Sequence, residues 1–258
     1  MAARLTWLGH ATVLIDVAGV RLLTDPVLRG RMAHLRRHGP VPRLPVGLDA
    51  VLLSHLHADH ADRPTLRRIE PGVPTIAPRG TAAALRRAGR ADVREVAVGD
   101  VVEIAPDVRV RAVPARHDGR RWPVGHAYAD ALGYVIESEI RVYFAGDTDL
   151  FAGMTHLGDE GLDAALLPVW GWGKRLGPGH LDPERAAEAA ARLRPRVAIP
   201  IHWGTFLPIG LRRRHGHLLH TPGPAFAGRV AERTPAIRTA VLRPGESLDL
   251  QPTVIPMR

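Results

Sequence analysis

Residues 54–60 read SHLHADH, so three histidines and one aspartate occupy a stretch of seven positions. The stretch directly follows DAVLL, a mostly apolar run with the composition of a buried strand. Residues two apart on an extended backbone point the same way, so His55 and His57 can converge on one point. Asp59 and His60 lie past the expected turn and can reach a second point nearby. This spacing favours a site for an ion such as zinc, which binds neutral imidazole, over a polar loop that is rich in histidine by chance.

Three further candidate ligands follow other apolar runs. His117 lies in VRAVPARHDG, Asp147 in VYFAGDTD behind a glycine, and His202 in VAIPIHWGT. A single histidine or aspartate at a strand end is commonplace. Taken together, the three supply what a two-metal centre needs beyond the ligands of one loop. The sequence therefore predicts a centre that gathers side chains from several strand ends.

The composition limits the chemistry of such a centre. The chain has 258 residues, of which 45% are hydrophobic and 24% charged, as is ordinary for a globular protein. It contains no cysteine, so a metal must be held by nitrogen and oxygen ligands. The formal net charge is +9, and Lys174 is the only lysine. A positive field of this kind gathers anionic substrates, phosphate or nucleic acid, unless it reflects only a compositional preference for arginine.

Strand and helix signals occur in both halves of the chain. Helices are expected at 81–89 and at 182–195, where Asp182 is a good N-cap and Pro183 takes the first helical position. Strands are expected at 4–9, 12–17 and 20–25, and near 49–53, 73–77, 108–113, 132–137, 141–145, 163–167 and 197–201. This order predicts α/β or α+β layers in a single domain over residues 1–258. Two arginine-rich stretches, 29–45 and 211–220, are expected to be surface loops.

No targeting segment is recognised at the N-terminus. It lacks the basic, apolar and small-residue regions of a signal peptide, and no segment approaches the roughly 18 apolar residues of a membrane span. A cytoplasmic protein is therefore expected. The sequence gives no indication of the oligomeric state.

The histidine motif and its later partners resemble the metallo-β-lactamase superfamily. The flanking text is similar to the branch that holds bacterial L-ascorbate-6-phosphate lactonase and N-acyl-phosphatidylethanolamine phospholipase D. The matching segments are WLGHATVLI at 7–15, TDPVL at 24–28, FAGDTD at 144–149, GHLDPERA at 179–186 and IPIHWGTF at 199–206. The chain departs from the lipases at Asp149, where they have glycine, and no long N-terminal extension is found. A phospholipid substrate is therefore not expected.

The resemblance implies a four-layer αββα sandwich with a binuclear site along one edge of its sheets. It assigns His55, His57 and His117 to the first metal. It assigns Asp59, His60 and His202 to the second, with Asp147 bridging both. The expected ions are two divalent metals, zinc first, with manganese or iron as alternatives. Asp25 would orient the ligand loop, or is simply the turn residue of TDP.

A hydroxide that bridges two such ions would be the nucleophile of a hydrolase. Asp59 would help orient it, and His180 would protonate the leaving group, unless His180 only packs at the start of a helix. The resemblance favours a small or medium anionic substrate, either a phosphodiester or a phosphorylated lactone or ester. His10 is interpreted as structural, and Trp172 as a candidate for an apolar wall or for the core.

Two other functions compete with this hydrolase. One is a nuclease of the same fold, which the positive charge favours. The chain lacks an aromatic and basic platform for a single strand, so no stable nucleic-acid partner is expected. The other is a metal-stabilised binding protein without activity, which the large ligand set disfavours because structural zinc sites are closed cages of four ligands. The arginines of 29–45 would either face the entrance and hold an anion, or lie on a solvated flap.

Overall fold

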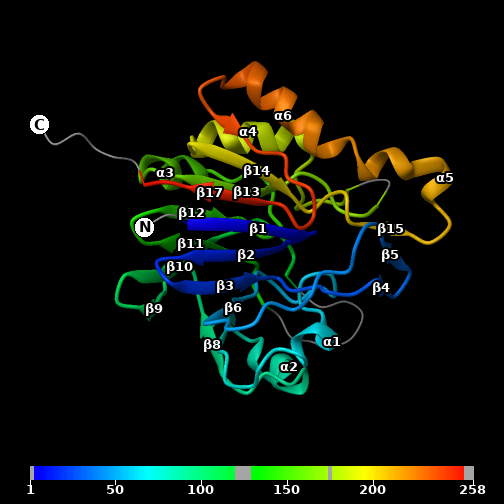
Figure 1. The fold of residues 1–258 in the computed structure, drawn as a ribbon. Helices are drawn as coiled ribbons and strands as arrows, with labels where there is room; N and C mark the ends of the chain where they lie inside the picture. The colour runs from blue at the N-terminus through cyan, green and yellow to red at the C-terminus, as the bar shows by residue number, and fades with distance from the viewer. Residues whose placement is uncertain (1–2, 120–128, 174–175, 253–258) are drawn as a thin grey trace, which may run out of the picture.

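The computed structural model describes residues 3–119, 129–173 and 176–252 and contains two seven-stranded sheets that face each other (Figure 1). The first sheet has, in spatial order, β17 (Ser247–Leu250), β1 (Ala3–Gly9), β2 (Thr12–Val17), β3 (Val20–Thr24), β6 (Ala50–Leu52), β7 (Thr75–Pro78) and β8 (Val93–Val96). The second has β16 (Arg238–Thr239), β14 (Val197–Ile201), β13 (Ala164–Pro168), β12 (Arg141–Phe144), β11 (Leu132–Glu137), β10 (Val108–Pro114) and β9 (Val101–Ala105).

Helices cover the outer face of each sheet. The first sheet carries α1 (Arg63–Leu66) and α2 (Ala82–Arg87), and the second carries α3 (Met154–Asp159), α4 (Pro183–Leu193) and α6 (Pro222–Arg233) (Figure 1). A short helix α5 (Arg212–His215) and a 3-10 turn η1 (Gly216–Leu219) lead into α6. The predicted αββα sandwich is confirmed. In the described parts of the chain, no helix is both long and apolar enough to cross a membrane.

Several strands, among them β2, β11 and β14, are apolar on both faces and are covered on both. In β2, Val13 and Ile15 belong to the core shared by both sheets, whereas Leu14 packs with Leu66 and Leu85 of the outer helices. A strand that is buried on both faces has a continuous run of apolar residues in its sequence, without the alternation of apolar and polar residues seen in a half-buried strand. This packing explains why the runs at 12–17, 132–137 and 197–201 identify their strands so well.

Both predicted helices are present, with different starts. Asp182 accepts a hydrogen bond from the Arg185 backbone N–H at 2.8 Å, as expected for the N-cap of α4. Thr81 precedes α2, but its hydroxyl donates to the Pro78 carbonyl at 2.6 Å and does not cap the helix. The stretch 211–220 is helical in α5 and η1, so its prediction as a loop was wrong.

The arginine-rich stretch 29–45 contains two strands. β4 (Arg31–Met32) and β5 (Leu35–Arg37) form a small sheet with β15 (Phe206–Pro208), and Arg37 is buried within it. The Arg37 guanidinium donates to the carbonyls of Val27 at 2.6 Å, Arg29 at 3.0 Å and Leu8 at 3.2 Å. Burial lowers the Arg37 pKa to about 10, so this side chain is still charged at neutral pH. The prediction of a surface loop was therefore wrong for Arg37.

Replacing Arg37 by alanine should destabilise the protein, because it leaves several buried carbonyls without a donor. We expect Arg37→Ala to lower the free energy of unfolding by about 2–4 kcal/mol. The neighbouring variant Arg36→Ala is the control, since Arg36 is exposed and should change stability by at most about 0.5 kcal/mol. Urea unfolding of both variants measures the difference, and equal stabilities would show that the carbonyls do not depend on Arg37.

Candidate metal centre

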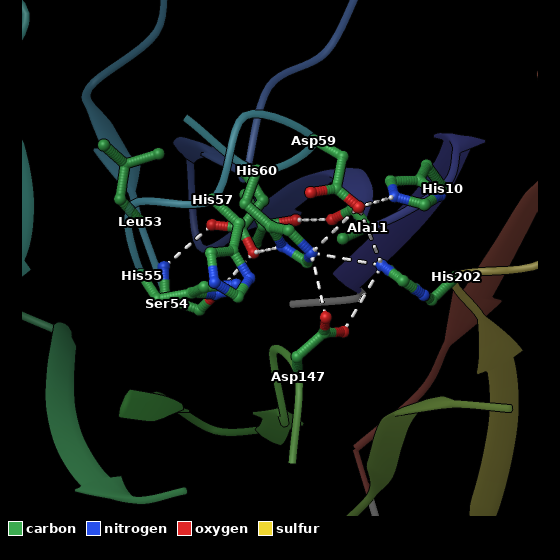
Figure 2. Close-up of polar contacts among 12 residues, drawn as sticks. His10, Ala11, Leu53, Ser54, His55, His57, Asp59, His60, Asp147 and His202 are labelled. Carbon is green, nitrogen blue, oxygen red and sulfur yellow. Dashed lines mark hydrogen bonds and ion pairs between the residues drawn. The ribbon is translucent and has the colours of Figure 1, made fainter. Parts of the chain in front are cut away.

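The candidate ligands lie where strands of both sheets end at one edge of the sandwich. His55 follows β6, His117 follows β10, Asp147 follows β12 and His202 follows β14. The loop after β6 turns back on itself, so that the amide N–H of His60 donates to the carbonyl of His57 at 3.1 Å. The structure brings together all the metal ligands predicted from the sequence. Figure 2 labels all of them except His117.

The side chains form two neighbouring groups. In the first, ring nitrogens of His55, His57 and His117 all lie within 4.8 Å of one another, and His117 Nε2 is 3.2 Å from His57 Nδ1. In the second, His60 Nε2 is 3.1 Å from His202 Nε2, and Asp59 Oδ2 lies 3.9 Å and 3.8 Å from these two nitrogens. These groups correspond to the two points predicted from the sequence.

Asp147 lies between the two groups. Its Oδ2 is 3.2 Å from His60 Nε2, and its Oδ1 is 3.3 Å from His202 Nε2 (Figure 2). It also forms a group with His117 and His180, and His180 Nε2 is 3.5 Å from Asp147 Oδ2. A carboxylate with neighbours on both sides has the placement that a bridging ligand requires.

The fully buried carboxylate of Asp25 holds the ligand loop in place. Its two oxygens accept hydrogen bonds from the Ser54 amide at 2.7 Å and the Ser54 hydroxyl at 2.5 Å, and from His60 Nδ1 at 2.7 Å. These contacts support the orienting role of Asp25 over a simple turn role. A hydrogen bond to one ring nitrogen orients the ring, so the other nitrogen of His60 faces the centre.

Two more histidines are oriented in the same way. His117 Nδ1 donates to the Gly179 carbonyl at 2.9 Å, and His202 Nδ1 donates to the Trp170 carbonyl at 2.6 Å. In both rings Nε2 is then left facing the shared space. Such contacts are typical of imidazoles that bind metal ions.

Buried polar atoms that lack a hydrogen-bond partner indicate whether these nitrogen and oxygen ligands fit a metal ion. The Ser54 hydroxyl donates to Asp25, so at 2.9 Å it accepts from His55 Nδ1 and leaves His55 Nε2 as a lone pair. His55 Nε2 and Asp147 Oδ1 are both buried without a hydrogen-bond partner. A buried acceptor without a donor is costly, and a cation bound to such an atom would remove that cost. Imidazole nitrogen and carboxylate oxygen together suit a divalent transition metal.

The protonation states of the buried histidines also favour the binding of a cation. Burial, and then the neighbouring His60, His117 and His57, hold the pKa of His55 well below its usual value, so His55 is neutral. Burial opposes charge on His60 as well, but the carboxylates of Asp147, Asp25 and Asp59 outweigh it and raise the His60 pKa well above its usual value. Several buried carboxylates therefore attract positive charge to this point, which a divalent ion would supply in place of a proton.

His10, which was interpreted as structural, lies in the cluster and contacts a candidate ligand. Its Nε2 donates to Asp59 Oδ2 at 3.1 Å, and its ring lies 3.8 Å from the His202 ring between centroids. Trp172 Nε1 donates to the same Asp59 oxygen at 3.0 Å. Burial, and then His202, lower the pKa of His10 to about 3, so the ring is neutral. Its position after β1, at the same edge as the other ligands, was the signal in the sequence.

A cavity of about 540 Å³ adjoins the cluster. Met32, Leu35, Trp172 and Leu176 give it an apolar wall, and His180 lies on its lining next to the ligands. Two roles were predicted for Trp172, an apolar wall or core packing. Its place on the cavity lining fits the apolar wall. The rings of His34 and Trp172 are in a T-shaped arrangement with their centroids 5.1 Å apart.

The arginines of 29–45 do not line this cavity, although their stretch lies over it. No arginine or lysine is found among the described residues that line it. Arg29 pairs with Asp62 at 2.6 Å, and Arg31 donates to the Ala33 carbonyl at 3.1 Å. Because side chains alternate along β5, Leu35 faces this cavity whereas Arg36 lines a different one. Of the two alternatives for these arginines, the described lining of the cavity does not support the one in which they face the entrance.

The sequence matches the family model described as the beta-lactamase superfamily domain over residues 20–203. The chain belongs to the metallo-β-lactamase superfamily. It is 31% identical over 250 residues to a metal-dependent hydrolase of Methanopyrus kandleri, with 95% of this chain and 99% of that protein covered. It is 33% identical over 231 residues to N-acyl-phosphatidylethanolamine-hydrolyzing phospholipase D 1 of Caenorhabditis elegans, which covers 80% of this chain. The match spans only 64% of that phospholipase.

Solved structures show the same fold. Igni18, a metallo hydrolase of Ignicoccus hospitalis, aligns with a TM-score of 0.73 at 23% identity and covers 97% of this chain and 99% of its own. The chain is thus a metal-dependent hydrolase of the metallo-β-lactamase superfamily.

Left-handed backbone gathers at this metallo-β-lactamase site. His10, Asp25 and His202 have φ values of 54°, 32° and 64°, and each immediately follows or lies near the end of a strand. Such conformations cost free energy in residues other than glycine and cluster at functional sites. Gly146, before Asp147, has φ of 59°, and a Cβ added there would lie 2.4 Å from the Ser54 Cβ.

Adding a methyl group at Gly146 should separate the Asp147 loop from the ligand loop. Gly161→Ala is the matched control, because Gly161 also has positive φ, at 77°, but has no neighbour within 4 Å of an added Cβ. We expect Gly161→Ala to cost about 1–2 kcal/mol from the backbone alone. Gly146→Ala should lose about 1–3 kcal/mol more, from the clash with Ser54. Chemical unfolding measures both, and equal losses would contradict the close packing at Gly146.

Proposed function

We propose that the chain binds two divalent metal ions, zinc foremost, and hydrolyses a phosphodiester that carries an apolar group. His55, His57 and His117 would hold one ion, and Asp59, His60 and His202 the other. Asp147 would contact both. The observation that carries this proposal is the pair of buried unpartnered atoms, His55 Nε2 and Asp147 Oδ1, inside a cluster of oriented imidazoles.

When bound, two such ions would polarise the phosphoryl oxygen and lower the pKa of the attacking water. The remaining roles fall to side chains. Asp59 has one oxygen anchored by His10 and Trp172, so its carboxylate is held still and would orient the water as well as bind metal. The hydrogen bonds to Asp25, Gly179 and Trp170 hold the imidazoles in place before the ions bind.

His180 would protonate the leaving oxygen. Its Nδ1 donates to the Gly177 carbonyl at 3.1 Å, and its Nε2 lies 3.5 Å from Asp147 on the lining of the cavity. Burial lowers the pKa of His180, but the contact with Asp147 outweighs burial and raises it above its usual value. An imidazole on the cavity lining beside the candidate ligands is suited to general acid catalysis.

The substrate class is inferred from the cavity and from one relative. The apolar wall of Met32, Leu35, Trp172 and Leu176 would contact an alkyl or aromatic group beside the cluster. The phospholipase of C. elegans is named for a phosphodiester substrate with apolar chains. The metal ions would meet the negative charge of the diester, since the described lining of the cavity offers no arginine or lysine.

The metal content of Asp147 variants tests the two-metal proposal. Elemental analysis of the purified protein should find up to two transition-metal ions per chain, and a strong chelator should abolish hydrolysis of bis(p-nitrophenyl) phosphate. Asp147→Ala should lose metal, because it removes a contact to both groups, and should lower turnover by about 10²-fold or more. Asp149→Ala is the control, because Asp149 pairs with Arg185 outside the cluster. Full activity in chelator would refute the proposal.

The role of His180 is tested by varying the leaving group. His180→Ala should lower kcat by about 10²–10⁴-fold on diesters with poor leaving groups, the usual contribution of an acid catalyst. The loss should shrink for p-nitrophenolate, which leaves without a proton, and the metal content should not change. The same loss on every leaving group would instead assign His180 to substrate binding or packing.

A further inference from the structure

A second cavity, of about 1030 Å³, lies beyond the segment that follows His202. Trp203 and Gly204 line it, and it has no described lining residue in common with the cavity beside the cluster. The proposed hydrolysis makes no use of this space.

Positive side chains from three separate elements surround the second cavity. Arg36 comes from β5, Arg212 from α5 and Arg243 from the loop before β17, and all three are exposed. His38 and His220 lie among them. The described lining contains no aspartate or glutamate.

These arginines have no partner in the described parts of the chain. None of the three guanidinium groups forms an ion pair there, whereas Arg29, Arg185 and many others pair with carboxylates. The carboxylate of Glu246 accepts from the backbone amide of Arg243 at 2.8 Å and not from its guanidinium. Charges that converge on a concave surface without counter-charges create a local positive field.

The positive charges around the second cavity affect the pKa of His38. Burial lowers the pKa of His38 most, and the positive charges of Arg212, Arg36 and His220 lower it further. Arg37 also lines the cavity, but its guanidinium is occupied by backbone carbonyls.

The interior of the same cavity is apolar. Trp7 and Trp203 stack with ring centroids 5.6 Å apart, and both are nearly fully buried. Leu219 and Leu242, also buried, complete this lining. The cavity therefore combines an apolar floor with cations at the rim, in the size range of small-molecule sites.

We propose that this cavity binds a small amphipathic anion, with a phosphate or carboxylate head on Arg36, Arg212 and Arg243 and an apolar body against the tryptophan and leucine floor. Guanidinium groups suit both heads because their planar fork of N–H donors can form paired hydrogen bonds to two oxygens of a carboxylate or of a phosphate. The site is independent of the metal ions. It would receive its ligand whether or not the proposed hydrolysis is correct.

Calorimetric titration of the purified protein with octyl phosphate and with octanoate tests the site. Arg36→Gln combined with Arg212→Gln should weaken the binding of whichever probe binds more tightly by about tenfold or more, because two charged contacts are lost. Arg213→Gln combined with Arg214→Gln is the matched control. It removes the same charge from neighbouring exposed positions that do not line the cavity. Metal content and thermal stability should be the same in both double variants.

Four outcomes would overturn the proposal. Equal weakening by the two double variants would mean a general effect of charge. Binding that neither variant changes would place the probe elsewhere, for example at the metal cluster. Binding of octyl glucoside as tight as that of the anions would show that no anion is recognised. Ethyl phosphate should bind more weakly than octyl phosphate, since it cannot reach the apolar floor, and equal affinities would also refute the site.

Discussion

The carboxylate of Asp25 joins the end of β3 to the loop that carries most of the candidate ligands, through Ser54 and His60. A buried charged group is costly unless its oxygens are fully paired, and here each oxygen accepts from the ligand loop. The same contacts decide which nitrogens face the centre: the Ser54 hydroxyl is committed to Asp25, so it orients His55, and His60 is oriented directly. The geometry of both proposed metal positions therefore depends on one side chain that touches neither.

Much of the fold and of the site could be predicted from local sequence. Strands buried on both faces read as apolar runs, and a ligand that follows such a run must lie at the sheet edge, which is why His117, Asp147 and His202 were identified correctly as neighbours. His10 was missed because its contact with Asp59 requires the end of β1 to meet a loop from another part of the sheet. Arg37 was misplaced for a similar reason. Its burial follows from the pairing of β5 with β15, between positions about 170 residues apart, which no local pattern reports.

The strand β5 separates two different environments. Leu35 contributes to the apolar wall beside the cluster, and Arg36, the next residue, contributes to the cationic rim of the second cavity. The pairing of Phe206 with Arg37 ties this strand to the segment that begins at His202. One short sheet thus shapes the cavities on both of its sides, and a shift in its register would exchange their polarity.

The left-handed backbone at His10, Asp25 and His202 restricts how this protein can change over evolution. Only glycine, asparagine, aspartate and histidine adopt that conformation with modest cost, and β-branched or bulky residues do not. A lineage could exchange these three side chains among that small set, which spans nitrogen and oxygen donors, while the backbone stays as it is. Recruitment of other side chains would require the loops to be rebuilt. New metal preferences should therefore arise more readily at His55, His57 or His117, where the backbone is ordinary.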